Sequence, residues 1–159
     1  MTPFHAHDGD HLRRAIELVY EARKRGNAPF GAVLVGEDGR ILAEGENTQN
    51  MERDVTGHAE THLLREACRL YDPQTLAAST LYSSGEPCAM CSGTIFWSGV
   101  GRVVYAMSST RLYELFPPDE ANPLMQLPCR EVLASGTRAT EVIGPVLEEE
   151  AERVFEGLV

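Results

Sequence analysis

A histidine and two cysteines constrain this chain more than any other feature of its sequence. Gly57-His58-Ala59-Glu60 is followed thirty positions later by Pro87-Cys88-Ala89-Met90-Cys91. One imidazole and two thiolates suit zinc, and three protein ligands leave the fourth tetrahedral position open to water. Glu60 is not needed as a ligand, so its carboxylate is free to move the protons of that water. The spacing therefore predicts a catalytic zinc site rather than a closed structural one.

His62 offers an alternative interpretation of the same segment. It follows His58 by four positions, which on a helix is the same face. With Cys88 and Cys91 it would complete a closed Cys2His2 site, and the chain would be a zinc-stapled binding module without enzymatic activity. The open site is favoured, because a closed one leaves Glu60 without a role and a domain of this length does not need a metal to fold. His62 is then expected to be partly exposed or to line the mouth of a pocket.

Charge limits the partners of the protein. The formal net charge of the 159 residues is −10. A protein that grips nucleic acid usually presents a basic face to the phosphates. The locally basic stretches, Arg13-Arg14 and Arg23-Lys24-Arg25, are expected on the solvated face of a helix. Nucleic acid is therefore not the expected partner.

Other features of the sequence favour a cytosolic protein with one domain, residues 1–159. No apolar run approaches the roughly 20 residues that span a bilayer, so no membrane partner is expected. The N-terminus lacks the layout of a secretory signal. The two remaining cysteines, Cys68 and Cys129, are expected to be small buried thiols.

Apolar periodicity predicts helices that alternate with strands. Helices are expected at residues 9–25, 58–70, 88–97, 129–134 and 146–158, with Asp8 or Asp10 able to cap the first. Strands are expected at residues 30–36, 41–45, 79–83, 102–106 and 140–143. Residues 46–56 and 108–122 are expected to be loops, the second because of Pro117-Pro118. This order predicts an α/β domain with helices on both faces of a mixed sheet.

The predicted helices give the metal motif a physical basis. Cys88 and Cys91 fall in the first turn of one helix, where their spacing places both sulfurs on one face. His58 falls in the first turn of another helix. The positive ends of two helices would then favour thiolates and anions at one point.

With these motifs the chain resembles the cytidine and deoxycytidylate deaminase superfamily, in particular the branch that holds cytosine, guanine and tRNA adenosine deaminases. The resemblance is carried in order by residues 29–33 (PFGAV), 44–47 (EGEN), 58–60 (HAE), 86–91 (EPCAMC) and 101–105 (GRVVY). It implies a three-layer α/β/α sandwich around a mixed five-stranded sheet. It also implies one zinc ion on His58, Cys88 and Cys91, with Glu60 as the proton shuttle.

The resemblance extends to the substrate and the assembly. It implies that Asn47 hydrogen-bonds the substrate and that the backbone of Ala59 contributes. Dimers or larger oligomers are common in the family, so a homodimer is one possible assembly. Phe30 suits packing against a planar base. Phe116 and Asp119 belong to an acidic segment, residues 113–120, that is the candidate lid over the pocket.

The expected reaction is the hydrolytic deamination of a free nucleobase or its nucleoside, with a guanine-like or cytosine-like ring. Water replaces an exocyclic amine by a carbonyl, and ammonia is released. Ala89 departs from some cytosine deaminases, which place an acidic residue there. The acidic stretch at residues 147–156 departs from the tRNA enzymes, which usually have basic residues near this end. A tRNA adenosine deaminase acting at the wobble position is the alternative.

Overall fold

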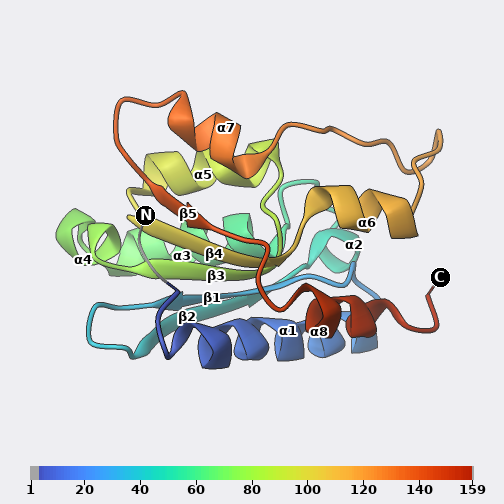
Figure 1. Ribbon diagram of the computed structural model, residues 1–159, viewed down its shortest axis with the longest axis horizontal. Helices are drawn as coiled ribbons and strands as arrows, with labels where there is room; N and C mark the ends of the chain where they lie inside the picture. Colours follow the sequence, from blue (N-terminus) through green and yellow to red (C-terminus); the bar gives the residue numbers. More distant parts are fainter. Residues whose placement is uncertain (1–3, 159) are drawn as a thin grey trace.

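A mixed sheet of five short strands forms the middle layer of the protein (Figure 1). The computed structural model describes residues 4–158. The strands are β1 (Gly31–Val35), β2 (Ile41–Glu46), β3 (Thr80–Gly85), β4 (Arg102–Met107) and β5 (Glu141–Ile143). They lie in the order β2-β1-β3-β4-β5, with β1 antiparallel to both of its neighbours and β3, β4 and β5 parallel. Because β1 and β4 are buried along their whole length, β1 is a continuous apolar run and β4 is one after its first residue, Arg102.

Helices cover both faces of this sheet, as Figure 1 shows. On one face lie α1 (Asp8–Lys24), α8 (Glu148–Glu152) and the 3-10 turn η1 (Arg153–Phe155). On the other lie α3 (Ala59–Leu70), α5 (Ala89–Ser98) and α7 (Cys129–Ala134). Three short helices, α2 (Gln49–Glu52), α4 (Pro73–Ala77) and α6 (Ser109–Leu115), lie at the ends of the sheet. The predicted three-layer α/β/α sandwich is confirmed.

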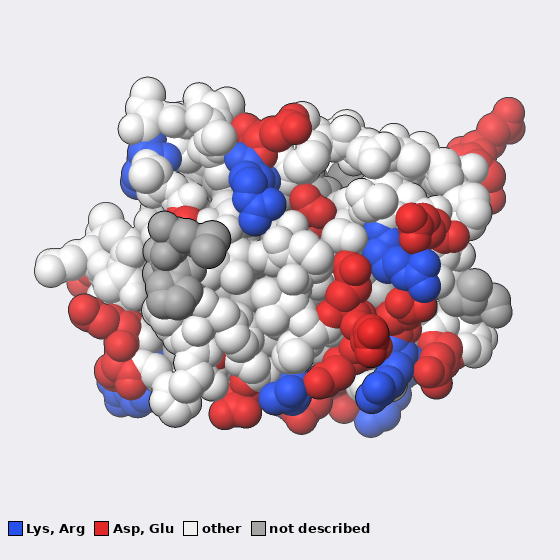
Figure 2. Space-filling model, viewed as in Figure 1, with Lys and Arg blue, Asp and Glu red and all other residues white. Residues whose placement is uncertain are grey.

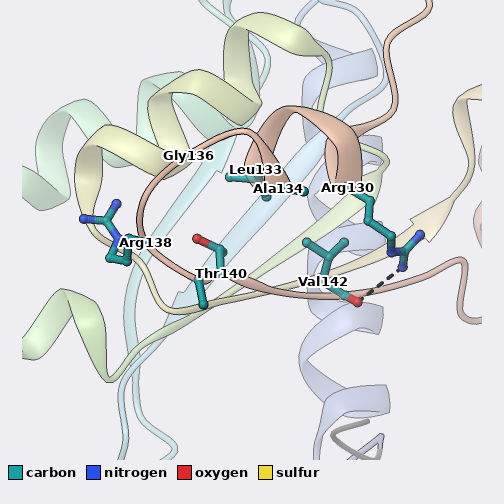
Figure 3. Close-up of a pocket in the computed structure, with 8 residues that line it drawn as sticks. Arg130, Leu133, Ala134, Gly136, Arg138, Thr140 and Val142 are labelled. Carbon is teal, nitrogen blue, oxygen red and sulfur yellow. Dashed lines mark hydrogen bonds between the residues drawn. The ribbon is translucent and has the colours of Figure 1, made fainter.

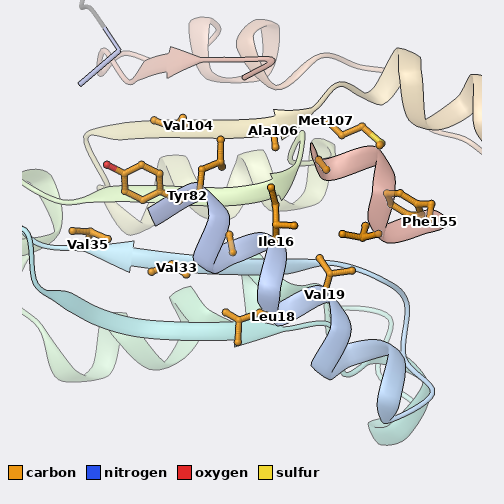
Figure 4. Close-up of a cluster of buried hydrophobic side chains, with 14 residues drawn as sticks. Ile16, Leu18, Val19, Val33, Val35, Tyr82, Val104, Ala106, Met107 and Phe155 are labelled. Atoms are coloured by element: carbon orange, nitrogen blue, oxygen red, sulfur yellow. The ribbon is translucent and has the colours of Figure 1, made fainter. Parts of the chain in front are cut away.

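The pleat of the strands divides the core into two clusters. Val33, Tyr82 and Val104 pack with Ile16 and Val19 of α1 on one face (Figure 4). The residues next to them in each strand point to the other face and pack under α3, α5 and α7. Each helical layer therefore has its own apolar core. Among the described residues, no helix combines the length and the apolar character that a bilayer crossing needs.

A buried ion pair fixes the start of α1 to the sheet. Asp8 is 0% exposed, and its carboxylate accepts two hydrogen bonds from the guanidinium of Arg102, at 2.8 and 2.7 Å. Tyr82 donates to the same carboxylate at 2.6 Å, as does the backbone N–H of His5. Asp8 was a candidate helix cap, but His7 holds the N-cap position. Asp8 instead joins the first helix to a strand that lies 94 residues further along the chain.

The prediction of a loop at residues 108–122 is wrong for the segment that forms α6. Ser108 caps this helix, since its hydroxyl accepts the backbone N–H of Arg111 at 3.2 Å. Pro117-Pro118 come after the helix has ended at Leu115. The two prolines therefore end the helix but do not prevent it from forming. Residues 46–56, also predicted as loop, contain the single turn α2.

Two predictions at the end of the chain and on α3 need correction. The predicted helix at residues 146–158 is shortened to α8, because the chain tightens into η1 and so places Val154 and Phe155 in the core. Cys68 is exposed rather than buried, since it lies next to Ala67 on α3 and off the buried stripe of that helix. Cys129 is buried as predicted.

Candidate metal centre and active site

The predicted zinc ligands stand at the starts of two neighbouring helices. His58 is the N-cap of α3 and Cys88 the N-cap of α5, and both residues have extended backbones. Cys91 lies one turn into α5. The sequence placed His58 and Cys88 one position too far inside their helices. The helix ends should still favour thiolates and anions here, because N-cap side chains lie where the helix backbone presents unpaired N–H groups and a positive end.

The ligand atoms have the separations that tetrahedral zinc requires. The Sγ atoms of Cys88 and Cys91 each lie 3.5 Å from Nδ1 of His58. Zinc bonds of about 2.3 Å to sulfur and about 2.05 Å to nitrogen, at the tetrahedral angle, would place these atoms roughly 3.6 Å apart. Within the described part of the chain, these three residues are the only cluster of histidine, cysteine or acidic side chains with metal-binding geometry. The residues present therefore fit one zinc ion.

The pKa values of the two thiols are shifted in opposite directions. The pKa of Cys88 is lowered to about 4, because Cys91 hydrogen-bonds to its sulfur and His58 lies beside it. The same contact with Cys88, together with burial, raises the pKa of Cys91. Thr61 donates a further hydrogen bond to Sγ of Cys91 at 3.2 Å. A divalent cation between the two sulfurs would stabilise both as thiolates.

Glu60 is a buried carboxylate beside this cluster. It is 5% exposed, and burial raises its pKa above the usual range. Ser83 of β3 donates a hydrogen bond to Oε1 of Glu60 at 2.6 Å. This contact fixes the carboxylate and leaves Oε2 as the oxygen without that constraint. Ser83 was not a candidate from the sequence, because nothing local to a buried strand indicates which helix its side chain meets.

A small cavity of about 150 Å³ brings most of the candidate residues together. Phe30, Asn47, His58, Glu60 and Cys88 line it. Its other lining residues are Ala28, Gln49, Glu86, Ser109, Leu112 and Tyr113, of which Tyr113 alone lies in the predicted lid segment, residues 113–120. The last three belong to α6, so this helix forms a wall of the cavity.

The remaining candidates lie elsewhere. Ala59 and Cys91 are fully buried next to the cavity. His62 is partly exposed and belongs neither to the metal cluster nor to the lining, among residues 4–158. Phe116 packs edge-on against Phe155, with ring centroids 5.4 Å apart, as part of the core. Asp119 is exposed and accepts the backbone N–H groups of its own turn.

A larger hollow of about 500 Å³ lies between α7 and β5 (Figure 3). Arg130 and Arg138 stand at its two ends, and Arg130 donates a hydrogen bond to the backbone oxygen of Val142 at 3.2 Å. Its lining has no histidine, cysteine or carboxylate among the described residues. Size alone therefore does not locate the chemistry, which belongs to the smaller cavity.

The α/β/α sandwich, together with a histidine and two cysteines at the starts of two helices, defines a zinc-binding protein of the deaminase type. Residues 6–107 match the family described as the cytidine and deoxycytidylate deaminase zinc-binding region. The chain belongs to this family, as its motifs predict.

Relatives within the family differ in their substrates. The chain is 37% identical over 141 residues to a probable cytosine deaminase of Schizosaccharomyces pombe, covering 89% of this chain and 85% of the relative. It is 43% identical over 100 residues to the guanine deaminase of Bacillus subtilis, covering 62% and 64%. A solved structure from work on A-to-I editing by tRNA:A34 deaminases has a TM-score of 0.71 and 28% identity, covering 92% of this chain and 99% of that one. The relatives share a deaminase fold and act on three different rings.

Proposed function

We propose that this protein is a zinc-dependent hydrolytic deaminase of a free aminated nucleobase or its nucleoside. The observation that carries the proposal is the carboxylate of Glu60 in the same cavity as His58 and Cys88. A closed structural zinc site would not need a buried carboxylate beside it. Zinc-binding thiols also suit a reducing compartment such as the cytosol. A homodimer, expected from the resemblance, stays a prediction.

His58, Cys88 and Cys91 would hold the metal, and zinc supplies a Lewis acid that lowers the pKa of bound water to about 7. Glu60 accepts a proton from the attacking water. Its carboxyl group donates this proton to the ring nitrogen next to the attacked carbon. The carboxylate then takes the second proton of the water from the hydroxyl group now on that carbon and donates it to the departing amine, so that a carbonyl and ammonia result. Ser83 holds Oε1 during these transfers, so the same carboxylate serves each of them without changing its position.

The cavity supports a small substrate. Its volume of about 150 Å³ is below the roughly 300–1,000 Å³ typical of sites for drug-sized ligands, and so suits a single base. Phe30 offers an aromatic wall to a planar ring, and Leu112 and Tyr113 also line the cavity.

Surface charge also favours a free base over a nucleic acid. Figure 2 shows acidic side chains interleaved with Lys and Arg over the region of α1 and α8. There Arg13 pairs with Glu150 at 3.0 Å and Arg111 with Glu152 at 2.6 Å. These arginines are therefore neutralised by neighbouring carboxylates rather than free to bind phosphates. Similarity to tRNA-specific adenosine deaminases keeps a wobble-position adenosine as the second candidate.

Ammonia release from a panel of substrates tests the proposal. The panel contains guanine, cytosine, adenine, their nucleosides, and a tRNA anticodon stem-loop with adenosine at the wobble position. We expect turnover of a free base or nucleoside, with guanine or cytosine the best. If only the stem-loop is turned over, the protein is a tRNA adenosine deaminase and not a deaminase of free bases or nucleosides.

Asn47 is proposed to bind the substrate through its amide nitrogen. The side chain is 2% exposed, and its Oδ1 accepts the backbone N–H of Gln49 at 3.0 Å. This contact leaves Nδ2 as the end that can donate to an acceptor on the ring. Asn47→Ala should raise KM about tenfold, the equivalent of one hydrogen bond of roughly 1.4 kcal/mol, in a folded protein.

Steady-state kinetics and thermal melting check this prediction. Asn50→Ala is the matched control, because Asn50 is exposed and its amide donates only to the backbone oxygen of Gly26. If Asn47→Ala has the kinetics of the wild type, Asn47 does not belong to the site.

A further inference from the structure

One carboxylate in the cavity wall joins the starts of two helices. Oε2 of Glu86 accepts the backbone N–H of Ser109 at 2.9 Å, and Oε1 accepts that of Cys129 at 3.1 Å. Ser109 is the first residue of α6, and Cys129 is the first residue of α7. The two donors lie 23 and 43 residues further along the chain. Glu86 therefore holds together segments that no local sequence pattern connects.

These contacts satisfy a specific need of the two helices. The first backbone N–H groups of a helix have no partner inside the helix, and a negative charge is favoured at that end. Glu86 supplies a hydrogen-bond acceptor and a negative charge to the starts of both α6 and α7. Its own backbone N–H donates to Met107 of β4 at 2.7 Å, which anchors the residue to the sheet. The position of its carboxylate is thereby set by the sheet rather than by either helix.

Glu86 also stands directly before the zinc-binding segment. Pro87 follows it, and Cys88 is the N-cap of α5. On the other side of the contact, α6 contributes Leu112 and Tyr113 to the cavity wall. The carboxylate thus links the segment that carries a metal ligand to the helix that faces the substrate.

We propose that Glu86 is a positioning residue that sets the α6 wall of the cavity against the metal centre and thereby determines substrate affinity. Both of its oxygens are engaged by backbone donors, so it acts through α6 rather than by reacting with the substrate. The inference rests on the proposed function, because its kinetic consequence requires a deaminase.

The first test is Glu86→Gln, which keeps the shape of the side chain. The amide has one oxygen, so it can accept from only one of the two N–H groups in this geometry, and its charge is lost. We expect KM to rise about tenfold while kcat stays within about twofold, since the wall binds the substrate and its transition state alike. Zinc content should stay near one ion per chain, and the amide of Ser109 should exchange hydrogen faster.

A second variant removes the donor and keeps Glu86. Ser109→Pro deletes the N–H at the first position of α6, where proline is well tolerated. Ser108 before it already has φ −69 and ψ 151, the extended backbone that a residue before proline prefers. Ser109→Ala is the reference for loss of the hydroxyl. Relative to Ser109→Ala, Ser109→Pro should raise KM by about the same factor as Glu86→Gln does. The double variant Glu86→Gln/Ser109→Pro should raise KM little more than either substitution alone, because both break the same contact.

Glu114→Gln is the matched control for charge, because Glu114 lies on α6 and pairs only with Arg111, away from the cavity. Its KM should equal that of the wild type. Wild-type protein that turns over no base or nucleoside overturns the proposed function, and the exchange measurement then still tests the contact. If the wild type is active and Ser109→Pro leaves KM unchanged, the inference about Glu86 is wrong. The Ser109→Pro measurement decides the question even if Glu86→Gln fails to fold.

Discussion

Glu60→Gln is expected to lower kcat by about 10³-fold or more while the protein still binds about one zinc ion per chain. Proton transfer by one positioned group contributes typically 10²–10⁴-fold, and here a single carboxylate serves several transfers. The amide keeps the volume of the side chain and can accept the hydrogen bond from Ser83, so the cavity should keep its shape. It cannot accept a proton from water. The effect should therefore fall on kcat and not on metal content.

Steady-state kinetics with the best substrate of the panel, and zinc analysis by mass spectrometry, measure the two quantities. Glu66→Gln is the matched control on the same helix, since Glu66 is exposed and pairs with Arg69 on the surface. It should have wild-type kinetics. Loss of zinc together with unfolding in Glu60→Gln would contradict a role in proton transfer. Full activity would favour a zinc-stapled binding module.

Asp8→Asn is expected to lower the free energy of unfolding by about 3–5 kcal/mol, the usual cost of removing one partner from a buried ion pair. The substitution keeps the size of the side chain but leaves the Arg102 guanidinium, 9% exposed, with only the longer 3.6 Å contact to Glu141 as a counter-charge. Denaturant unfolding measures the change. Asp10→Asn on the same turn is the control, because the side chain of Asp10 is 76% exposed and should contribute less than about 0.5 kcal/mol.

The pH dependence of this difference has a defined sign. Burial raises the pKa of Asp8, but the hydrogen bonds from Arg102 and Tyr82 outweigh it and lower the pKa to about 2. An unfolded chain has an aspartate pKa of about 3.9. The ionised carboxylate therefore stabilises the fold fully above about pH 4, and this contribution is lost as the pH falls towards 2. The gap between wild type and Asp8→Asn should narrow over that window, and a constant gap would show that the ion pair is not its source.

The parts of this protein that follow from local rules could be predicted from its sequence. The strands β1 and β4 are apolar runs bounded by turns, and the sequence gives their limits to within a residue or two. Most of the metal cluster also follows from a local pattern in the sequence. A helix start at Cys88 places Cys91 on the same face, and only His58 has to come from elsewhere.

The rest depends on contacts that no local pattern encodes. Ser83 of β3 meets Glu60 because the fold brings that strand beside the start of α3. Asp8 meets Arg102 because the start of α1 lies beside the start of β4. The helix that carries Leu112 and Tyr113 could not be predicted for a different reason. The proline pair drew attention to the end of that segment and hid a helix of seven residues before it.

Two separate sets of structural elements build the cavity. The donors of the metal centre stand at the starts of α3 and α5, which are anchored in the core. The other groups that line the cavity come largely from α2, α6 and the segments next to them, which are short and lie at the rim of the sheet. Under the proposed function, sequence change in the second set would alter which ring is accepted without disturbing the first. A lineage built in this way can exchange its substrate and keep its reaction.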